Sequence, residues 1–192
     1  MKLFFKRIGA FFLDCTILFF ALTFINLFIP TFVDVNDLSD RTIEITEKYM
    51  DGEVTQEKFV EETNEISYLL QKGTYLTTIA GIVVYILYFV VYQAYNNGQT
   101  LGKKVLKIRV LKTDDDVPSI NMLIRRCLIP YGILVNFILA ISILFLNKNM
   151  YNTINVILSN LHLVVLLISI ILVFIKKRGI HDYLANTKVE EI

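Results

Sequence analysis

Residues 153–175, TINVILSNLHLVVLLISIILVFI, form an apolar run without a charged residue. A helix needs roughly 20 residues to cross the ~30 Å hydrocarbon core of a bilayer. An uncharged apolar run longer than about 18 residues is typical of a transmembrane helix rather than of a buried helix in a soluble domain. This stretch therefore predicts that the chain is a membrane protein.

Three further stretches are long and apolar enough to span the membrane: residues 8–33, 74–95 and 127–147. The first contains one charge, Asp14, and the second contains none. Because backbone groups have no water partner in lipid, each stretch is expected to be a helix. The sequence thus predicts an all-α membrane protein built as a bundle of four transmembrane helices.

The composition agrees with this prediction. Of the 192 residues, 55% are hydrophobic and 19% are charged, and the mean hydropathy is +0.56. Soluble domains have about 45–50% apolar and about 25% charged residues. The net charge of +1 excludes a basic nucleic-acid-binding protein. Two cysteines and two histidines, with no CxxC pair, provide no disulfide scaffold and no zinc site, so no cofactor is expected.

The orientation follows from the charges of the loops. Fourteen of the 19 Lys and Arg residues lie in residues 1–7, 96–126 and 176–192, which share one face of the membrane. Only five lie on the opposite face, in residues 34–73 and 148–152. By the positive-inside rule, both termini are expected in the cytoplasm of a protein of the cell (plasma) membrane.

The segment 34–73 is an acidic insertion with 11 acidic and 4 basic residues. Apolar residues recur at helical spacing in 38–50 and 55–72, on either side of the turn signal Asp51-Gly52. This pattern predicts a helical extracytoplasmic insertion. The acidic stripe of Glu57, Glu61 and Glu65 is either a solvated face or a surface that attracts cations or a partner.

The segment 96–126 is a basic cytoplasmic loop. Residues 98–104, GQTLGKK, lack the spacing of a phosphate-binding loop, and Lys104 stands where that loop has Ser or Thr. Residues 105–112 alternate loosely between apolar and basic, which predicts a short strand pair or an interfacial segment that lies on lipid headgroups. Ser119 is a candidate N-cap for a helix over 120–126.

An ionised carboxylate inside a membrane helix costs about 2.5–3.5 kcal/mol on insertion scales. The presence of Asp14 inside a predicted membrane helix therefore requires a structural or functional explanation. Arg7 lies seven residues earlier, too far for a tight pair within one helix, so each side chain is expected to meet a partner from another segment. Asp14 is either a structural, paired or protonated carboxyl group, or a group that binds protons or cations.

Two other polar features lie near the last predicted span. Asn155, Ser159, His162 and Ser169 form one stripe, which is used either for hydrogen bonds between helices or for a proton relay through His162. Asp182 follows that span and lies at the same membrane boundary as Arg7. The topology therefore predicts an Arg7–Asp182 salt bridge.

Three segments together form a known pattern. They are Arg7-Ile8-Gly9-Ala10 followed by Asp14, then GQTLGKK (98–104) with Ile108-Arg109-Val110, and finally HDYLANTKV (181–189). In these segments the chain resembles the RDD family of bacterial membrane proteins, named for one Arg and two Asp. The resemblance makes Arg7, Asp14 and Asp182 the signature triplet. The secondary candidates are Gly98, Gly102, Lys103, Arg109 and His181 from the same segments, and His162 from the polar stripe.

The resemblance implies little about activity. Some relatives have been proposed as cation/proton antiporters and others as regulators of partner membrane proteins, and the family shares no cofactor or reaction. The sequence shows no nucleophile–base pair that would suggest an enzyme. The leading hypothesis is a homo-oligomeric transporter in which Asp14 exchanges protons or monovalent cations across the bilayer. The alternative is a non-transporting regulator or scaffold that binds another membrane protein.

Overall fold

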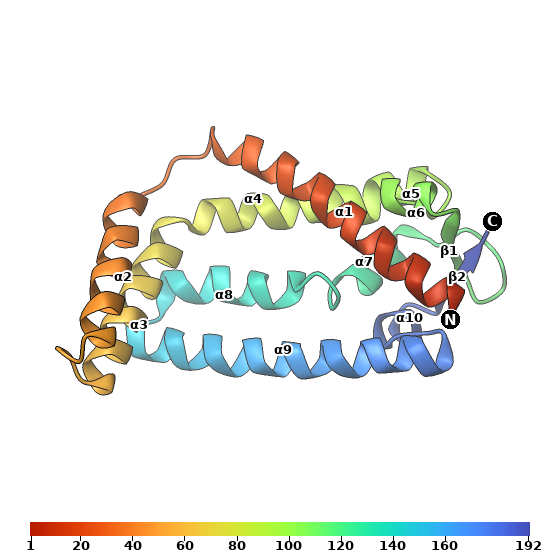
Figure 1. Cartoon of the computed structure of the whole chain (residues 1–192). Coiled ribbons are helices and arrows are strands. Elements are labelled where there is room, and N and C mark those ends of the chain that lie inside the picture. The colour runs from red at the N-terminus through yellow and green to blue at the C-terminus, as the bar shows by residue number, and fades with distance from the viewer.

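The computed structural model describes the whole chain, residues 1–192, and is mostly helical (Figure 1). Its long elements are α1 (Lys2–Asn26), α4 (Tyr75–Ile86), α8 (Ile133–Phe145) and α9 (Lys148–Lys176). The helix α4 continues through the π-helical segment η1 (Leu87–Tyr92) and α5 (Gln93–Tyr95). These elements run side by side, and both termini lie at one end of the bundle.

Three helical elements are long and apolar enough to cross a membrane: Lys2–Asn26, Tyr75–Tyr95 and Lys148–Lys176. Their outer faces carry many exposed large apolar side chains, among them Phe12 on α1 and Ile171 on α9. Such surfaces are rare on monomeric soluble proteins but are expected where lipid is the solvent. The prediction of a helical membrane protein is thus supported by length and by surface chemistry.

The third predicted span, 127–147, is not one helix. The helix α7 (Ile120–Cys127) ends where that span was expected to begin, and residues 128–131 form turns. The helix α8 has 13 residues, about 20 Å at 1.5 Å per residue, which is short of a ~30 Å core. Pro130 explains the break, since proline lacks an N–H donor and disfavours helical conformation in the preceding residue.

The other predicted spans differ from the structure mainly at their ends. The first helix begins at Lys2 and ends at Asn26, so residues 27–33 lie outside the helix predicted over 8–33. The element Tyr75–Tyr95 agrees with the predicted 74–95. The helix α9 includes residues 148–152, which were expected to be a loop, because the Asn147 side chain caps its start by accepting the Met150 N–H at 3.0 Å.

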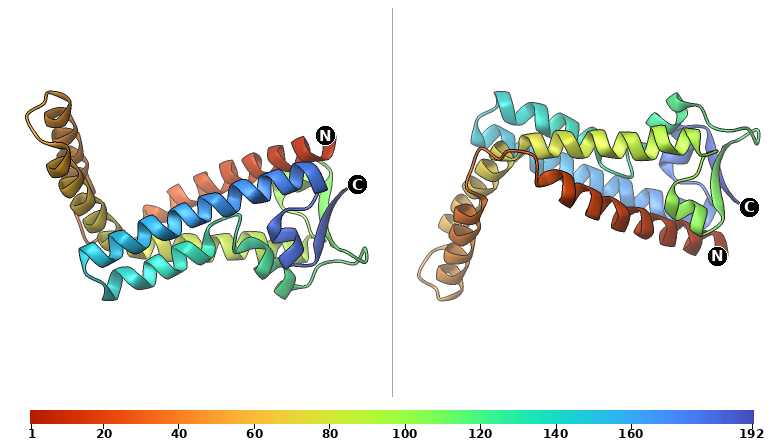
Figure 2. Two further views of the ribbon diagram at one scale, coloured as in Figure 1. Left: turned by 90° about the horizontal axis from the view of Figure 1, so that it is seen from below. Right: turned by 90° about the horizontal axis from the view of Figure 1, so that it is seen from above.

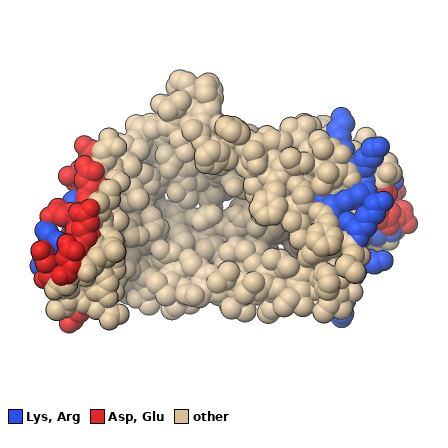
Figure 3. Space-filling model, in the orientation of Figure 1, with Lys and Arg blue, Asp and Glu red and all other residues tan.

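The insertion 34–73 folds as the predicted pair of helices, α2 (Val35–Met50) and α3 (Gln56–Gly73). They pack together through Leu38, Ile45 and Ile66, and they lie at the end of the bundle opposite to both termini (Figure 2). Acidic side chains gather at this end, whereas most visible Lys and Arg side chains gather at the end with the termini (Figure 3). The molecule is therefore electrically polar along its long axis.

A small sheet at the end with the termini corrects the all-α prediction. The strand β1 (Ile108–Lys112) pairs antiparallel with β2 (Thr187–Glu191). A strand in 105–112 was one of the two predicted possibilities, but its partner is the C-terminal segment. Two short helices, α6 (Leu101–Val105) and α10 (Ile180–Leu184), lie beside the sheet. Ser119 precedes α7 as predicted, although its side chain makes no capping hydrogen bond.

Candidate functional site

Asp14 is buried beneath the start of α6. Its carboxylate accepts hydrogen bonds from the Thr100 hydroxyl at 2.6 Å, the Tyr88 hydroxyl at 2.7 Å and the Gly102 N–H at 2.8 Å. The Gly102 N–H lies in the first turn of α6, where backbone donors have no partner within the helix. A carboxylate is a favourable partner for such donors. Asp14 thus fixes α6 against α1.

Two glycines allow this close packing. A Cβ atom at Gly102 would collide with the Ala10 carbonyl oxygen of α1 and would lie 2.8 Å from Asp14 Oδ1. Gly98 has a φ of +79°, and a Cβ atom there would collide with the Val110 carbonyl oxygen. In the segment GQTLGKK, the two glycines therefore allow the backbone to approach the backbone of α1 at Ala10 and that of β1 at Val110.

Asp182 lies at the centre of a second buried group, here called the Asp182 cluster: Arg7, Arg126, His181 and Asp182. Its Oδ2 accepts Arg7 Nη2 at 2.6 Å and the Gly179 N–H at 2.9 Å, while Oδ1 accepts Arg126 Nη1. The predicted Arg7–Asp182 salt bridge is therefore confirmed. Arg126, the second partner of Asp182, comes from α7 and was not predicted.

The charges of this cluster determine its protonation. Burial alone would raise the pKa of Asp182, but the charges of Arg126 and Arg7 outweigh it and hold that pKa well below the ordinary value. Burial, assisted by Arg126, lowers the pKa of His181 to about 3, so its ring is neutral at pH 7. Because a guanidinium only donates, His181 Nε2 accepts from Arg7 Nη2 at 3.4 Å. Its Nδ1–H then faces Ser169 Oγ at 3.1 Å.

Lys103 is a buried basic side chain of α6, close enough to Asp14 and Asp182 to be affected by the charges of both carboxylates. Its Nζ makes only long hydrogen bonds, to Thr100 Oγ1 at 3.3 Å and to Gln93 Oε1 at 3.5 Å. The ammonium also lies 5.7 Å from the centre of the Phe89 ring. Burial lowers the pKa of Lys103 to about 7, although the charge of Asp14 opposes this shift. Lys103 therefore changes its charge near neutral pH.

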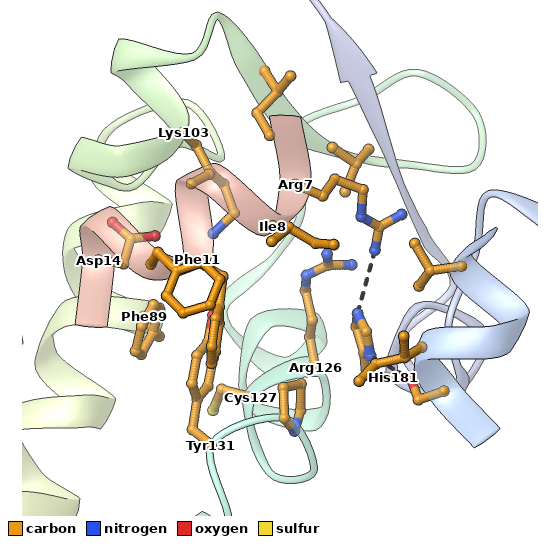
Figure 4. A pocket seen from close by; sticks show the side chains of 18 of the residues that line it. Arg7, Ile8, Phe11, Asp14, Phe89, Lys103, Arg126, Cys127, Tyr131 and His181 are labelled. Carbon is orange, nitrogen blue, oxygen red and sulfur yellow. Dashed lines mark hydrogen bonds between the residues drawn. The ribbon is translucent and has the colours of Figure 1, made fainter. Parts of the chain in front are cut away.

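One cavity connects both groups. It has a volume of about 500 Å³ and lies between α1, η1, α7 and α9. Figure 4 shows Asp14 and Lys103 at one part of its lining and Arg7, Arg126 and His181 at another, with the aromatic rings of the lining beside Asp14. The cavity thus has a basic polar end and an apolar body.

The comparisons identify the family. The sequence model of a protein family, described as RDD family, matches residues 2–186, nearly the whole chain. The protein belongs to the RDD family. No curated protein and no solved structure matches the chain significantly.

In this RDD protein, the Arg and two Asp of the resemblance do not form one group. Arg7 and Asp182 pair directly, whereas Asp14 accepts its hydrogen bonds from Tyr88, Thr100 and Gly102. Their expected distribution, with each charge partnered from another segment, is confirmed.

Of the remaining predicted residues, Ser169 contacts the Asp182 cluster through His181. The polar stripe of the RDD protein is divided, because Ser159 bonds to Asn155 at 3.1 Å while Ser169 bonds to His181 and to the Ile180 N–H. His162 lies next to Gly132, away from both groups. Arg109 lies on β1, and its buried Nε has no hydrogen-bond partner.

The sequence interpretation missed three contributors: Tyr88, Thr100 and Arg126. Tyr88 belongs to a tyrosine stripe at helical spacing, which is typical of packing. Thr100 lies inside the segment that carries the family resemblance. Arg126 had one available signal, since it stands immediately before an apolar stretch expected to enter the membrane, where an unpaired cation is costly.

Proposed function

We propose that this RDD protein is a non-transporting membrane regulator or scaffold that binds another membrane protein. The contacts of Asp14 carry the proposal. Three protein donors occupy its carboxylate oxygens, and an exchanger must break such bonds each time the group takes up an ion. Lys103, Arg7 and Arg126 line the same cavity, and their charges disfavour a second cation.

In this role, Asp14 and Asp182 hold the loop, the sheet and the C-terminal segment against α1. We place this end in the cytoplasm of the cell membrane and the α2–α3 hairpin outside, on the strength of the Lys and Arg distribution. The protein would then present an ordered surface on each side of the bilayer, to which a partner protein could bind. The lipid-facing sides of α1 and α9 would be available for lateral contact or for a homo-oligomer.

Cation/proton exchange is the second candidate, favoured by one observation. Lys103 has a pKa of about 7 and lines the same cavity as Asp14, so a proton-titrating group stands beside an intramembrane carboxylate. An oligomer would supply the additional helices that alternating access requires.

Proteoliposomes distinguish the two candidates. For a regulator or scaffold, a cation gradient is expected to produce no more pH change with wild-type protein than in empty vesicles. Asp14→Asn is expected to lower the melting temperature in detergent, equivalent to about 1.5–3 kcal/mol for a hydrogen bond to a charged group. Asp40→Asn, on the exposed face of α2, is the matched control and is expected to change stability by less than about 0.5 kcal/mol.

Ion flux in the wild type that disappears in a stably folded Asp14→Asn protein would contradict the proposal and support exchange. Flux that persists in Asp14→Asn would contradict both the proposal and the role of Asp14 as the exchanging group.

A further inference from the structure

We propose that the cavity between α1 and α9 binds one anionic phospholipid of the bilayer, with its phosphate at Arg126 and Lys103 and its acyl chains along the apolar wall. The proposal goes beyond the proposed function and does not depend on it. A regulator and an exchanger could each use such a site.

The balance of charge favours an anion. Three basic side chains, Arg7, Lys103 and Arg126, are buried or nearly so, against two carboxylates, Asp14 and Asp182. The two arginines balance the two carboxylates, and Lys103, with a pKa of about 7, adds a positive charge on the protein molecules in which it is protonated. His181 adds no charge at pH 7. Both carboxylates already accept hydrogen bonds from protein donors. The excess charge of the buried groups is therefore positive, and it lies where little water is present. A buried charge without a counterion is strongly unfavourable.

Free donors also face the cavity. Arg126 donates to protein only through Nη1, to Asp182 and at 2.7 Å to Thr187. Its Nη2 and Nε have no protein acceptor and are not fully enclosed. The Lys103 ammonium has only two long hydrogen bonds. Guanidinium and ammonium groups are the usual protein donors to phosphate oxygens.

The rest of the cavity suits acyl chains. Its walls on α1 and α9 are formed by apolar side chains, namely Phe4, Phe11 and Phe12 from α1 and Leu166, Ile170 and Val173 from α9. The two helices approach at the end with the termini, where the Phe4 and Phe174 rings lie 5.2 Å apart. Beyond this contact the surface between them is hollowed (Figure 3). The apolar body is therefore accessible from the lipid.

The depth of the basic groups also fits a lipid. Arg7 lies near the start of α1, the end of this apolar helix at which a headgroup would be expected. Asp14 lies about 10 Å deeper, at 1.5 Å per residue. A free phosphate would occupy only the basic end and would leave the aromatic and aliphatic walls uncovered. A phospholipid satisfies both parts of the cavity.

The protein contains no tryptophan, which allows a direct test. Ile170→Trp places a single fluorophore in the cavity wall. Ile171→Trp, on the neighbouring position of α9, lies outside the cavity lining and is the matched control at nearly the same depth. Each variant is reconstituted in phosphatidylcholine vesicles with a minor fraction of dibrominated phosphatidylglycerol or dibrominated phosphatidylcholine, and bromine quenching is measured.

We expect the tryptophan at position 170 to report about a tenfold preference for brominated phosphatidylglycerol, because the choline cation of phosphatidylcholine cancels the negative charge that the basic side chains attract. The tryptophan at position 171 should show no preference. In the Ile170→Trp background, Lys103→Gln should reduce the preference at least severalfold, whereas Lys104→Gln, at an exposed position, should leave it unchanged. Circular dichroism establishes that each variant is folded.

Equal quenching by both lipids at position 170 would overturn the proposal, as would a preference that survives Lys103→Gln. Inorganic phosphate at millimolar concentration should leave the lipid preference intact. Its loss in phosphate would assign the basic end to a free anion instead. If Lys103→Gln does not fold, the comparison between positions 170 and 171 decides the matter alone.

Discussion

At the scale of single residues, Asp182 combines full burial with contacts to two guanidinium groups. It is fully buried and lies between two guanidinium groups that come from opposite parts of the chain, Arg7 and Arg126. An ion pair of this kind contributes little net stability compared with an apolar replacement of the whole group, but loss of one member leaves charges buried and unpaired. Loss of the Asp182 carboxylate would leave two buried guanidinium groups without their counterion.

Asp182→Asn is therefore expected to destabilise the protein by about 3–5 kcal/mol, the usual cost of breaking a buried pair. Thermal unfolding in detergent measures this loss, with Glu53→Gln on the exposed hairpin turn as a control that should change little. Exchange of the pair, Arg7→Asp with Asp182→Arg, is not expected to restore stability, because the new arginine would face Arg126. Full recovery would show that Arg126 does not contact position 182.

His181 makes stability depend on pH. Its pKa falls from 6.5 to about 3 on folding, so between these values the unfolded chain binds a proton that the folded chain does not. The stability contributed by the neutral ring is complete above pH 6.5 and is lost as the pH falls toward 3, by roughly 1 kcal/mol per pH unit. Asp182, whose pKa is also lowered, adds to this loss below about pH 4.

His181→Gln should flatten the dependence of the melting temperature on pH between 7 and 5. His162→Gln, which replaces the other histidine and lies outside the Asp182 cluster, should retain the wild-type slope. Equal slopes in wild type and His181→Gln would show that His181 is not buried as a neutral ring.

At the scale of elements, the decisive contact is that of α6 with α1. The helix α6 has only five residues and cannot be stable alone. Asp14 supplies acceptors for its first turn, and Gly102 lets the two backbones approach. The carboxylate that first suggests transport thus has a sufficient structural explanation. At Pro130, by contrast, the helical conformation is interrupted: α7 ends at Cys127 and α8 begins at Ile133.

Gly102→Ala is expected to destabilise the protein by about 1–3 kcal/mol, because its methyl group overpacks against the fixed carbonyl of Ala10. Gly81→Ala is the matched control: a Cβ atom there meets no neighbour, and alanine favours the helix by about 0.5–1 kcal/mol. The two melting temperatures should move in opposite directions. A neutral Gly102→Ala would mean that α6 does not rest on α1.

At the scale of the whole molecule, the two ends have opposite chemistry. The α2–α3 hairpin is acidic, and the end with the termini is basic and contains the sheet (Figures 2 and 3). The pairing of β1 with β2 and the Arg7–Asp182 salt bridge join the first and last segments of the chain at that end. The hairpin has its own small core, which is separate from the main hydrophobic core.

This polarity predicts the topology in the cell. With Cys15 and Cys127 replaced by serine, Asp51→Cys at the turn of the hairpin should react with a membrane-impermeant maleimide in intact cells. Asp115→Cys, in the turn after β1, should react only after the membrane is permeabilised. Labelling of position 115 in intact cells would contradict a cytoplasmic location of the termini.

Elements with a local or periodic cause could be predicted from the amino-acid sequence. Apolar length was sufficient for α1, for the element Tyr75–Tyr95 and for α9, and apolar spacing around Asp51-Gly52 was sufficient for the hairpin. The same reasoning failed at 127–147, since a count of apolar residues does not include the effect of Pro130. The Arg7–Asp182 salt bridge could be anticipated because topology brings the two ends of the chain to one boundary.

Only the tertiary structure decided which side chains meet. Arg126 joins Asp182, and Thr100 and Tyr88 meet Asp14, across separations of 56 or more residues. The partner of β1 is likewise the C-terminal strand. Local sequence patterns do not contain such pairings, because a buried charge accepts any suitable partner that packing brings within hydrogen-bond distance. In lipid the need for a partner is visible in the sequence, while the identity of that partner depends on how the helices pack.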